Sequence, residues 1–322
     1  MKKSIFCLWL FFCVLNAQAR LGDGGYAGAF LRMAIGARAQ ALGDAYSAIP
    51  SGAISGLYNP ALLPQLPHRQ LSLAYGHLPL DRSTNYIGFA LPLRPQVGEE
   101  DGRLLKAGFS LAWLRAGVDN IDGRDLAGNQ IGTFSNSENA FYFSFALAPI
   151  ENASIGLSAK VLYNRMPNLA DDNSAVSSKG FGIDIGAYYS PLQNLSFGLV
   201  LRDNKSKYTW NTDKVWERGT SITYHFPRVL RLAASYQIPQ KWLLVTAELE
   251  DSKEQNPRYH FGAEFSYQQI GALQIGLDDQ RPCFGLQLGG HLFNHRTTLN
   301  YAYVFPDEFP GADHLFTWGF EF

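Results

Sequence analysis

Residues Tyr26–Pro64 read YAGAFLRMAIGARAQALGDAYSAIPSGAISGLYNPALLP, and this stretch differs in composition from everything that follows it. Alanine, glycine and serine dominate it, and charged residues are few. Apolar side chains recur at helical spacing as far as Ala41. Gly43 then ends the expected short helix, because glycine readily takes the left-handed conformation that commonly follows one. The composition predicts a compact head segment.

From Gln70 to the last residue, the chain consists mainly of segments in which apolar and polar residues alternate. Phe141 and Phe143, for example, share one side of a strand, and Tyr142 and Ser144 share the other, because successive strand side chains point to opposite faces. A compact head followed by many such strands predicts a plug inside a closed sheet. The alternative is a helical hairpin packed on one end of a β-sandwich.

The composition of the two strand faces favours a barrel with its apolar side chains outside. The non-apolar faces are rich in Gly, Ala and Ser, as in a crowded interior, and the apolar rows often carry Tyr or Trp near one end, as in aromatic girdles at membrane interfaces. Charged residues make up 17% of the chain, against about 25% in soluble domains. Strands of about 9 to 11 residues cross a bilayer when tilted.

The N-terminus indicates export. Lys2 and Lys3 precede an apolar run, and small residues lead up to Ala19, so residues 1–19 are predicted to be a cleaved signal peptide. No later apolar run reaches the about 18 to 20 residues of a membrane helix. Cys283 would be the only cysteine of the mature chain, which leaves no internal disulfide and no indicated role for it. The expected location is the outer membrane of a Gram-negative-type bacterium.

The strand count tests the barrel interpretation. The alternation marks 15 candidate strands, whereas bacterial single-chain barrels have even numbers, short periplasmic turns and longer outer loops. Treating residues 203–227 as one long outer excursion with an extended tip restores the alternation of short turns and long loops. The sequence therefore predicts a signal peptide (1–19), a hatch (20–69) and a 14-stranded antiparallel transmembrane β-barrel (70–322).

The last strand carries an assembly signal. Phe316, Trp318, Phe320 and Phe322 share one face, and the chain ends on Phe322. Alternating aromatics that end in a terminal Phe are typical of the signal read by the barrel assembly machinery. A soluble edge strand would expose these rings to water and promote aggregation. We therefore expect Phe320 and Phe322 to serve assembly.

Several motifs together resemble the PorV/PorQ family, which is related to the FadL-type outer-membrane proteins. They cover most of the mature chain and comprise Phe30-Leu31, Gly36–Ala39, Ala41–Tyr46, Tyr58–Leu62, Phe134–Phe141 and Gly180–Gly186. The Asn-Pro-Ala element, at Asn59, Pro60 and Ala61, is shared with the FadL-type proteins. The resemblance implies a 14-stranded barrel with an N-terminal hatch.

The resemblance also implies two functions. In the first, the protein is a component of type IX-like protein secretion and binds secreted proteins or secretion-system components through the outer loops 117–138, 164–178 and 203–227. In the second, it is a FadL-like transporter of hydrophobic small molecules. The small, polar wall faces slightly favour the first. A structural barrel without transport is a third possibility.

The motif residues also have a physical interpretation. Asn59 precedes Pro60, whose ring disfavours helix in the residue before it, so the Asn59 amide is free to brace the surrounding backbone. Arg38 lies among small residues and needs a partner, since a buried unpaired charge is costly. Asp184 and Glu264 are the candidate partners on the barrel wall.

Motifs for catalysis, cofactors or metals are not recognisable, so we expect a non-enzymatic protein without cofactor or metal. The acids near Asp122 lack the spacing of a calcium loop. A net charge of −1 gives no reason to expect nucleic acid. Tyr208, Trp210 and Trp216 in the outer excursion form a possible partner-binding surface, although they equally suit the headgroup layer or the barrel mouth.

Overall fold

The computed structural model describes residues 26–95, 105–167, 175–213, 219–268, 270–292, 294–306 and 311–322. The predicted signal peptide lies outside these residues. The strands of the described part belong to one antiparallel sheet. They are β1 (Gln70–Leu78), β2 (Arg82–Leu93), β3 (Lys106–Arg124), β4 (Gln130–Ile150), β5 (Ala153–Met166), β6 (Val176–Leu192), β7 (Leu195–Asn204), β8 (Lys207–Asn211), β9 (Ser221–His225), β10 (Val229–Gln237), β11 (Leu243–Ser252), β12 (Gln255–Tyr267), β13 (Gly271–Asp278), β14 (Arg281–Leu292), β15 (His295–Val304) and β16 (Asp313–Glu321).

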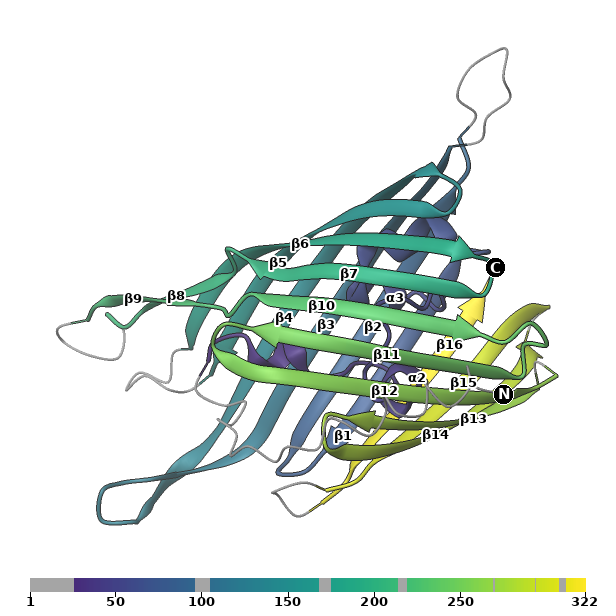
Figure 1. Ribbon diagram of the computed structural model, residues 1–322. Helices are drawn as coiled ribbons and strands as arrows, with labels where there is room; N and C mark the ends of the chain where they lie inside the picture. Colours follow the sequence, from purple (N-terminus) through teal and green to yellow (C-terminus); the bar gives the residue numbers. More distant parts are fainter. Residues whose placement is uncertain are drawn as a thin grey trace.

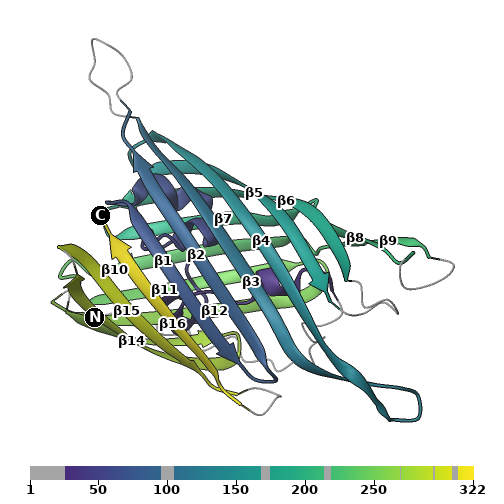
Figure 2. The ribbon, with the colours of Figure 1, turned by 180° about the vertical axis from the view of Figure 1, so that it is seen from behind.

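Fourteen of these strands close into a barrel (Figures 1 and 2). β1 pairs with both β2 and β16, β5 pairs with β6, and β7 pairs directly with β10. The ring therefore has no free edge. β8 and β9 are not part of the ring, because they form a hairpin attached to the end of β6. This arrangement confirms the predicted 14-stranded barrel and places the fifteenth candidate strand in the outer excursion.

The apolar rows of the strands face outward, as predicted. On β4, Phe143 has 61% of its surface exposed, whereas the adjacent Tyr142 and Ser144 have 3% and 1%. On β5, Leu157 is exposed, whereas Lys160 is completely buried. An apolar outer surface of this kind is what a lipid-facing barrel requires. No helix among the described residues is long and apolar enough to cross a bilayer.

The outer loops contain more regular structure than expected. β3 and β4 continue to pair past Val118 and extend beyond the wall, so most of the stretch predicted as loop 117–138 is a hairpin (Figure 1). The turn at its tip is held by Asp125, which accepts hydrogen bonds from the backbone N–H groups of Ala127 (2.9 Å) and Asn129 (2.8 Å). Antiparallel pairing satisfies backbone groups that a free loop would leave to water.

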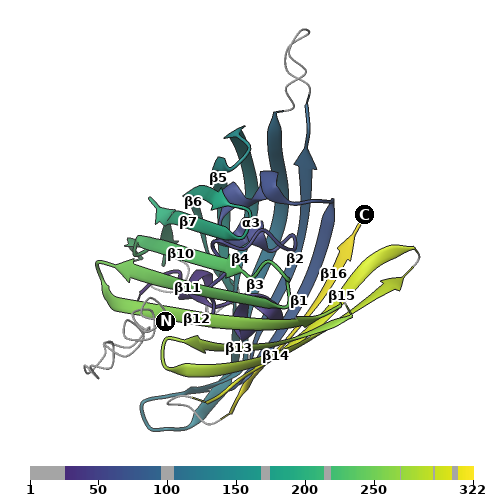
Figure 3. The same ribbon diagram turned by 45° about the vertical axis from the view of Figure 1, so that its right-hand side comes forward.

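The N-terminal segment lies inside the barrel (Figures 1 and 3). It contains only short helices, which are η1 (Ala29–Arg32), α2 (Ala37–Ala41), α3 (Ser55–Tyr58) and η2 (Pro60–Gln65). Almost every residue of Ile35–Pro64 is buried or half-buried. We call residues 26–66 the hatch. It begins near the outer end of the barrel, where the Tyr26 hydroxyl donates to the carbonyl of Glu254, and ends near the opposite end, where Arg94 donates to the carbonyl of Leu66.

The hatch helix differs from the expected one. The apolar spacing from Phe30 onward predicted a single short helix, but the chain turns at Gly36, whose φ is +88°. A residue with a Cβ disfavours that conformation. The result is a 3₁₀ turn followed by a separate short helix, α2, because buried contacts inside the barrel outweigh local helical periodicity.

Candidate functional site

The inward-facing glycines of the wall lie where the hatch backbone comes closest. A Cβ on Gly262 would lie 2.5 Å from the carbonyl oxygen of Leu42, and a Cβ on Gly156 would lie 2.6 Å from the backbone nitrogen of Ala61. Real Cβ atoms do not approach so closely. The hatch backbone comes equally close to Gly198 and Gly276, and the Asn59 side chain comes equally close to Gly186. The small residues of the inner faces therefore make room for hatch backbone.

Gly43 lies at the point where the hatch turns back after α2. Its φ is +67°, and a Cβ at this position would lie 2.5 Å from the carbonyl oxygens of both Leu277 and Phe261. The Gly43 carbonyl lies 2.9 Å from Nδ1 of His260 on β12. Both the backbone conformation and the close contact with the wall thus require glycine.

Asn59 joins three parts of the molecule. It is extended (φ −150°, ψ 109°) and its side-chain oxygen accepts from the backbone N–H of Ala61 at 3.0 Å, which caps η2 behind Pro60. Its amide nitrogen donates to the carbonyl of Ser47 at 2.9 Å and to that of Ala187 on β6 at 3.1 Å. The Asn-Pro-Ala element therefore ties two hatch segments to the wall.

Arg38 pairs with Glu264, one of its two candidate partners. Nε and Nη2 of Arg38 donate to the two carboxylate oxygens of Glu264 at 2.6 and 2.8 Å, and Nη1 donates to the Tyr46 hydroxyl at 3.1 Å. Burial alone would lower the pKa of the Arg38 guanidinium, but the charge of Glu264 and the Tyr46 contact raise this pKa above its ordinary value. The guanidinium stays charged and anchors α2 to β12.

Asp184, the other candidate, belongs to a separate buried group. Lys160 on β5 lies 2.8 Å from Asp184 and 2.5 Å from Asp203. A third group surrounds Arg231 on β10, which contacts Asp44 of the hatch at 2.8 Å, Glu248 at 3.2 Å, and Glu250. The sequence interpretation missed this group.

The alternation of the strands contained a signal for it. Arg231, Glu248 and Glu250 occupy inward positions on β10 and β11, and the residues beside them on the other face include Leu230, Leu232 and Leu249. A charged residue on an otherwise small-residue face indicates a buried ion pair. The Glu248 carboxylate also accepts from the backbone N–H of Ser47 (3.0 Å) and from its hydroxyl (2.8 Å), so this group again joins the hatch to the wall.

The aromatic residues of the outer excursion are placed at the barrel mouth. Tyr208 is 2% exposed, and its ring centroid lies 4.9 Å from that of Phe226 and 6.2 Å from that of Trp210. Trp216 lies outside the described residues. Tyr208 is therefore buried at the barrel mouth, whereas Trp210 is only half-buried.

The last strand, β16, pairs with β1 and β15 and closes the barrel. Phe316 and Trp318 face outward, with 45% and 41% of their surface exposed. Phe320 packs between Trp318 and Phe322, with its ring centroid 4.7 Å from that of Trp318 and 6.5 Å from that of Phe322. The backbone N–H of Phe322 donates to the carbonyl of Arg69 at 2.9 Å, so pairing continues to the end of the chain.

Apolar side chains form a continuous cluster between hatch and wall, which we call the seam. It runs from the mouth, where Tyr208 and Phe226 lie, to Leu244 near the other end of the wall. Its hatch members are Phe30, Leu31, Ile35, Ala39, Leu42, Tyr46, Ile49, Ile54, Leu57 and Tyr58, and its remaining wall members are Tyr86, Leu114, Ala140, Tyr142 and Leu162. The lumen is thus more apolar than the strand faces alone suggested.

One hollow lies inside the barrel and another lies on its outer face. One, of about 560 Å³, lies beside Arg38 and Glu264 and is lined by polar groups that include Gln70 and Asn300. The other is a groove of about 490 Å³ on the outer face of the wall, across β6, β7, β10, β11 and β12. The second groove exists because Ala234 and Ala247 leave space among larger outward side chains.

Comparisons with known proteins identify the fold. No protein-family model matches the chain, and no curated protein matches it. The CymD monoaromatic hydrocarbon channel shares 14% identity over 89% of this chain and 97% of its own, with a TM-score of 0.58. The toluene transporter TodX of Pseudomonas putida shares 14% over 88% and 96%, with a TM-score of 0.56. A FadL homologue of Pseudomonas aeruginosa shares 13% over 89% and 98%, with a TM-score of 0.55.

These comparisons correct the functional expectation. The structural neighbours are hydrocarbon channels and a FadL homologue, so the expected role in protein secretion is wrong, and the narrower resemblance to PorV/PorQ gains no support. The small, polar strand faces, which had slightly favoured secretion, instead accommodate the hatch. The chain has the fold of the FadL-type barrels and, with its apolar outer surface, is an outer-membrane protein of the Gram-negative type.

Proposed function

We propose that the protein passes small hydrophobic molecules across the outer membrane and has no enzymatic activity. The observation that carries this proposal is the seam, a continuous apolar cluster that leads from the barrel mouth along the hatch. An apolar molecule gains free energy by leaving water for such surroundings. The hydrocarbon channels that share this fold support the proposal and suggest monoaromatic hydrocarbons as first substrates to test.

The seam is filled by side chains at rest, so passage requires local rearrangement of the hatch. The hatch suits such movement, since its helices have four to six residues each and discrete polar anchors tie it to the wall. Short helices contribute little stability of their own. We further propose that the outer aromatic residues Tyr208 and Trp210 receive the molecule at the mouth, in place of the partner-binding role expected for them.

The test is uptake by intact cells, because hydrophobic solutes cross bare lipid vesicles without a protein. A bacterial strain that lacks its own hydrocarbon channels would express the protein, and initial uptake of labelled toluene would be compared with that of a labelled hydrophilic sugar. We expect faster uptake of toluene alone. Uptake equal to that of cells carrying an empty vector would contradict the proposal.

A matched pair of variants links uptake to the seam. Leu114 is 1% exposed and belongs to the seam, whereas Leu111 on the same strand is 42% exposed on the lipid face. Leu114→Ala removes the same atoms as Leu111→Ala but enlarges the interior. We expect Leu114→Ala to change toluene uptake and Leu111→Ala to leave it at the wild-type rate. Equal effects of the two substitutions would show that toluene does not pass along the seam.

A further inference from the structure

One buried histidine has a ring nitrogen that lacks a partner. His260 on β12 is completely buried, and within the described part of the chain its Nε2 has no hydrogen-bond partner. Its Nδ1 lies 2.9 Å from the carbonyl oxygen of Gly43 and 3.0 Å from a carboxylate oxygen of Asp278. Both neighbours only accept hydrogen bonds, so Nδ1 carries a proton, and Nε2 is the ring nitrogen that is left for another partner.

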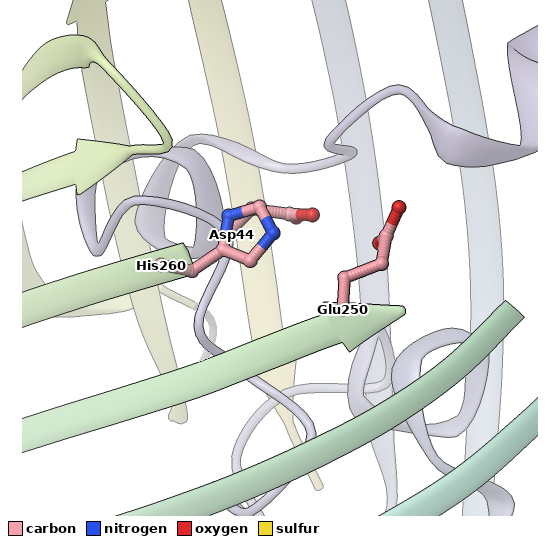
Figure 4. Close-up of side chains that lie close together, drawn as sticks. All are labelled: Asp44, Glu250 and His260. Carbon is pink, nitrogen blue, oxygen red and sulfur yellow. The ribbon is translucent and has the colours of Figure 1, made fainter. Parts of the chain in front are cut away.

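Two carboxylates lie beside this ring. Asp44 comes from the hatch and Glu250 from β11, and one ligand atom of each of the three side chains lies within 4.8 Å of the others (Figure 4). All three residues are buried. No metal motif is recognisable in the sequence, because Asp44 lies 216 positions before His260 and Glu250 lies on the neighbouring strand.

We propose that Asp44, Glu250 and His260 bind one divalent transition-metal ion that fastens the hatch to the wall. A neutral imidazole nitrogen with two carboxylate oxygens is a ligand set suited to Zn²⁺. Asp278 holds the protonated Nδ1, which is the arrangement that fixes a metal-binding histidine in its required tautomer. The proposal concerns the hatch anchor and does not depend on which molecules the barrel transports.

The local charge balance favours an added cation. Asp44, Glu248 and Glu250 surround the single guanidinium of Arg231, and Asp278 is matched by Arg258 at 3.3 Å. With Arg202, whose charge also acts on Glu250, four carboxylates of this group face three guanidinium groups, so one negative charge is left over when the His260 ring is neutral. Excess buried charge is costly unless a counter-ion compensates it.

Arg231 already bridges the two carboxylate ligands, because its Nη2 contacts Asp44 at 2.8 Å and also contacts Glu250, so a metal ion would bind through the remaining lone pairs of these carboxylates. A carboxylate has about four lone-pair positions, and the contacts of Asp44 with Arg231 (2.8 Å) and with the Tyr58 hydroxyl (2.7 Å) use two of them. Metal–ligand distances near 2.0–2.2 Å require the three ligand atoms to move closer together than they are. We expect the Glu250 side chain to rotate so that its carboxylate comes closer to the other two ligands.

The experiment measures zinc binding to the mature protein in detergent micelles. After treatment with a chelator, the protein is dialysed against Zn²⁺, and bound metal is measured by mass spectrometry. We expect about one Zn²⁺ per chain for the wild type and a loss of more than about tenfold in affinity for His260→Ala. The control is His291→Ala, which removes an exposed histidine of β14 and is expected to bind like the wild type. Zinc bound equally by wild type and His260→Ala would overturn the proposal, as would no bound zinc.

Three further measurements remain decisive if His260→Ala does not fold. Glu250→Gln keeps the shape of the side chain and should also weaken binding. Asp278→Asn should weaken it by about 10- to 100-fold, the usual effect of losing the partner of a metal-bound histidine. X-ray absorption of the zinc-loaded wild type should show one nitrogen neighbour from imidazole. A spectrum with oxygen neighbours only would contradict the assignment.

Discussion

At the scale of single residues, the hatch is held by polar anchors whose buried charges are paired. Arg38 with Glu264 ties α2 to β12, Asn59 ties η2 to β6, and Glu248 holds the backbone of Ser47. A buried charge that loses its partner destabilises a protein far more than an exposed one does. The hatch should therefore respond strongly to single substitutions at its anchors.

Glu264→Gln tests this expectation. It removes the charge that pairs with Arg38, whose side chain is 18% exposed, and should lower the free energy of unfolding of the hatch by up to about 3–5 kcal/mol. Hydrogen exchange of the hatch amides in micelles measures the effect. The control is Glu321→Gln, which breaks the more exposed pair with Arg296 (3.8 Å) and should cost about 0–1 kcal/mol. Similar exchange in the two variants would mean that the Arg38 pair does not anchor the hatch.

The wall glycines give a second prediction at this scale. Gly262→Val places a side chain where the carbonyl of Leu42 now lies, so the hatch must shift, at a cost of about 1–3 kcal/mol. Gly290→Val is the matched control, since a Cβ there would have nothing within 4 Å. Limited proteolysis should cut the hatch of Gly262→Val faster than that of Gly290→Val. Equal rates would show that the close contact at Gly262 is not needed.

The residue scale also shows what the sequence could and could not predict. Arg38 was expected to need an acid, and Glu264 was one of two candidates, because inward positions follow directly from strand alternation. The choice between Glu264 and Asp184 depended on which strand faces α2, and that is a property of the whole barrel. The group around Arg231 was missed because its hatch member, Asp44, is 187 residues away in the chain.

At the scale of elements, strand alternation was the most informative signal. It predicted the outward row of β4, because a period of two depends only on the backbone. It failed for the outer loops, where β3 and β4 continue as a hairpin, since polar residues on both faces carry no such signal. The hatch helices were also predicted poorly, because tertiary contacts decide segments of four to six residues.

The turn at the tip of the β3–β4 hairpin gives a pH-dependent prediction. Hydrogen bonds from the Asn129 side chain and backbone lower the pKa of Asp125 below its ordinary value. A depressed pKa means that the turn is stabilised above the ordinary pKa of the carboxyl group and loses this stabilisation as the pH falls through the lowered value. Asn129→Ala should move the pKa of Asp125 back towards its ordinary value. Titration of the Asp125 carboxyl by NMR measures it, and an unchanged pKa would contradict the role of Asn129.

The closing strand gives a further prediction. If Phe320 and Phe322 form the assembly signal, Phe322→Ala should lower the amount of barrel inserted in the outer membrane. The measurement is the fraction of protein that migrates as a folded barrel on gels without heating. Phe305→Ala, which removes an outward ring that is 40% exposed at the other end of the barrel, is the control. Full insertion of the Phe322 variant would mean that the terminal ring is not part of the signal.

At the scale of the whole molecule, the barrel has two apolar regions separated by its wall. Outside, the strand faces contact lipid, and inside, the seam lies between hatch and wall. The sequence predicted the first region and underestimated the second, because most of the interior apolar groups come from the hatch. This arrangement is the basis of the proposed transport of hydrophobic molecules.

The orientation of neighbouring residues on one strand tests this account most directly. Phe143 and Ser144 are adjacent on β4, but 61% of the surface of Phe143 is exposed and only 1% of that of Ser144. Two variants, Phe143→Cys and Ser144→Cys, would each carry one spin label and be placed in bilayers. Both would also carry Cys283→Ala, so that the label attaches only at the introduced cysteine. Oxygen, which dissolves in lipid, should relax the label at 143 strongly and the label at 144 weakly. Equal access at both positions, or greater access at 144, would contradict a barrel with its apolar face in lipid and its hatch inside.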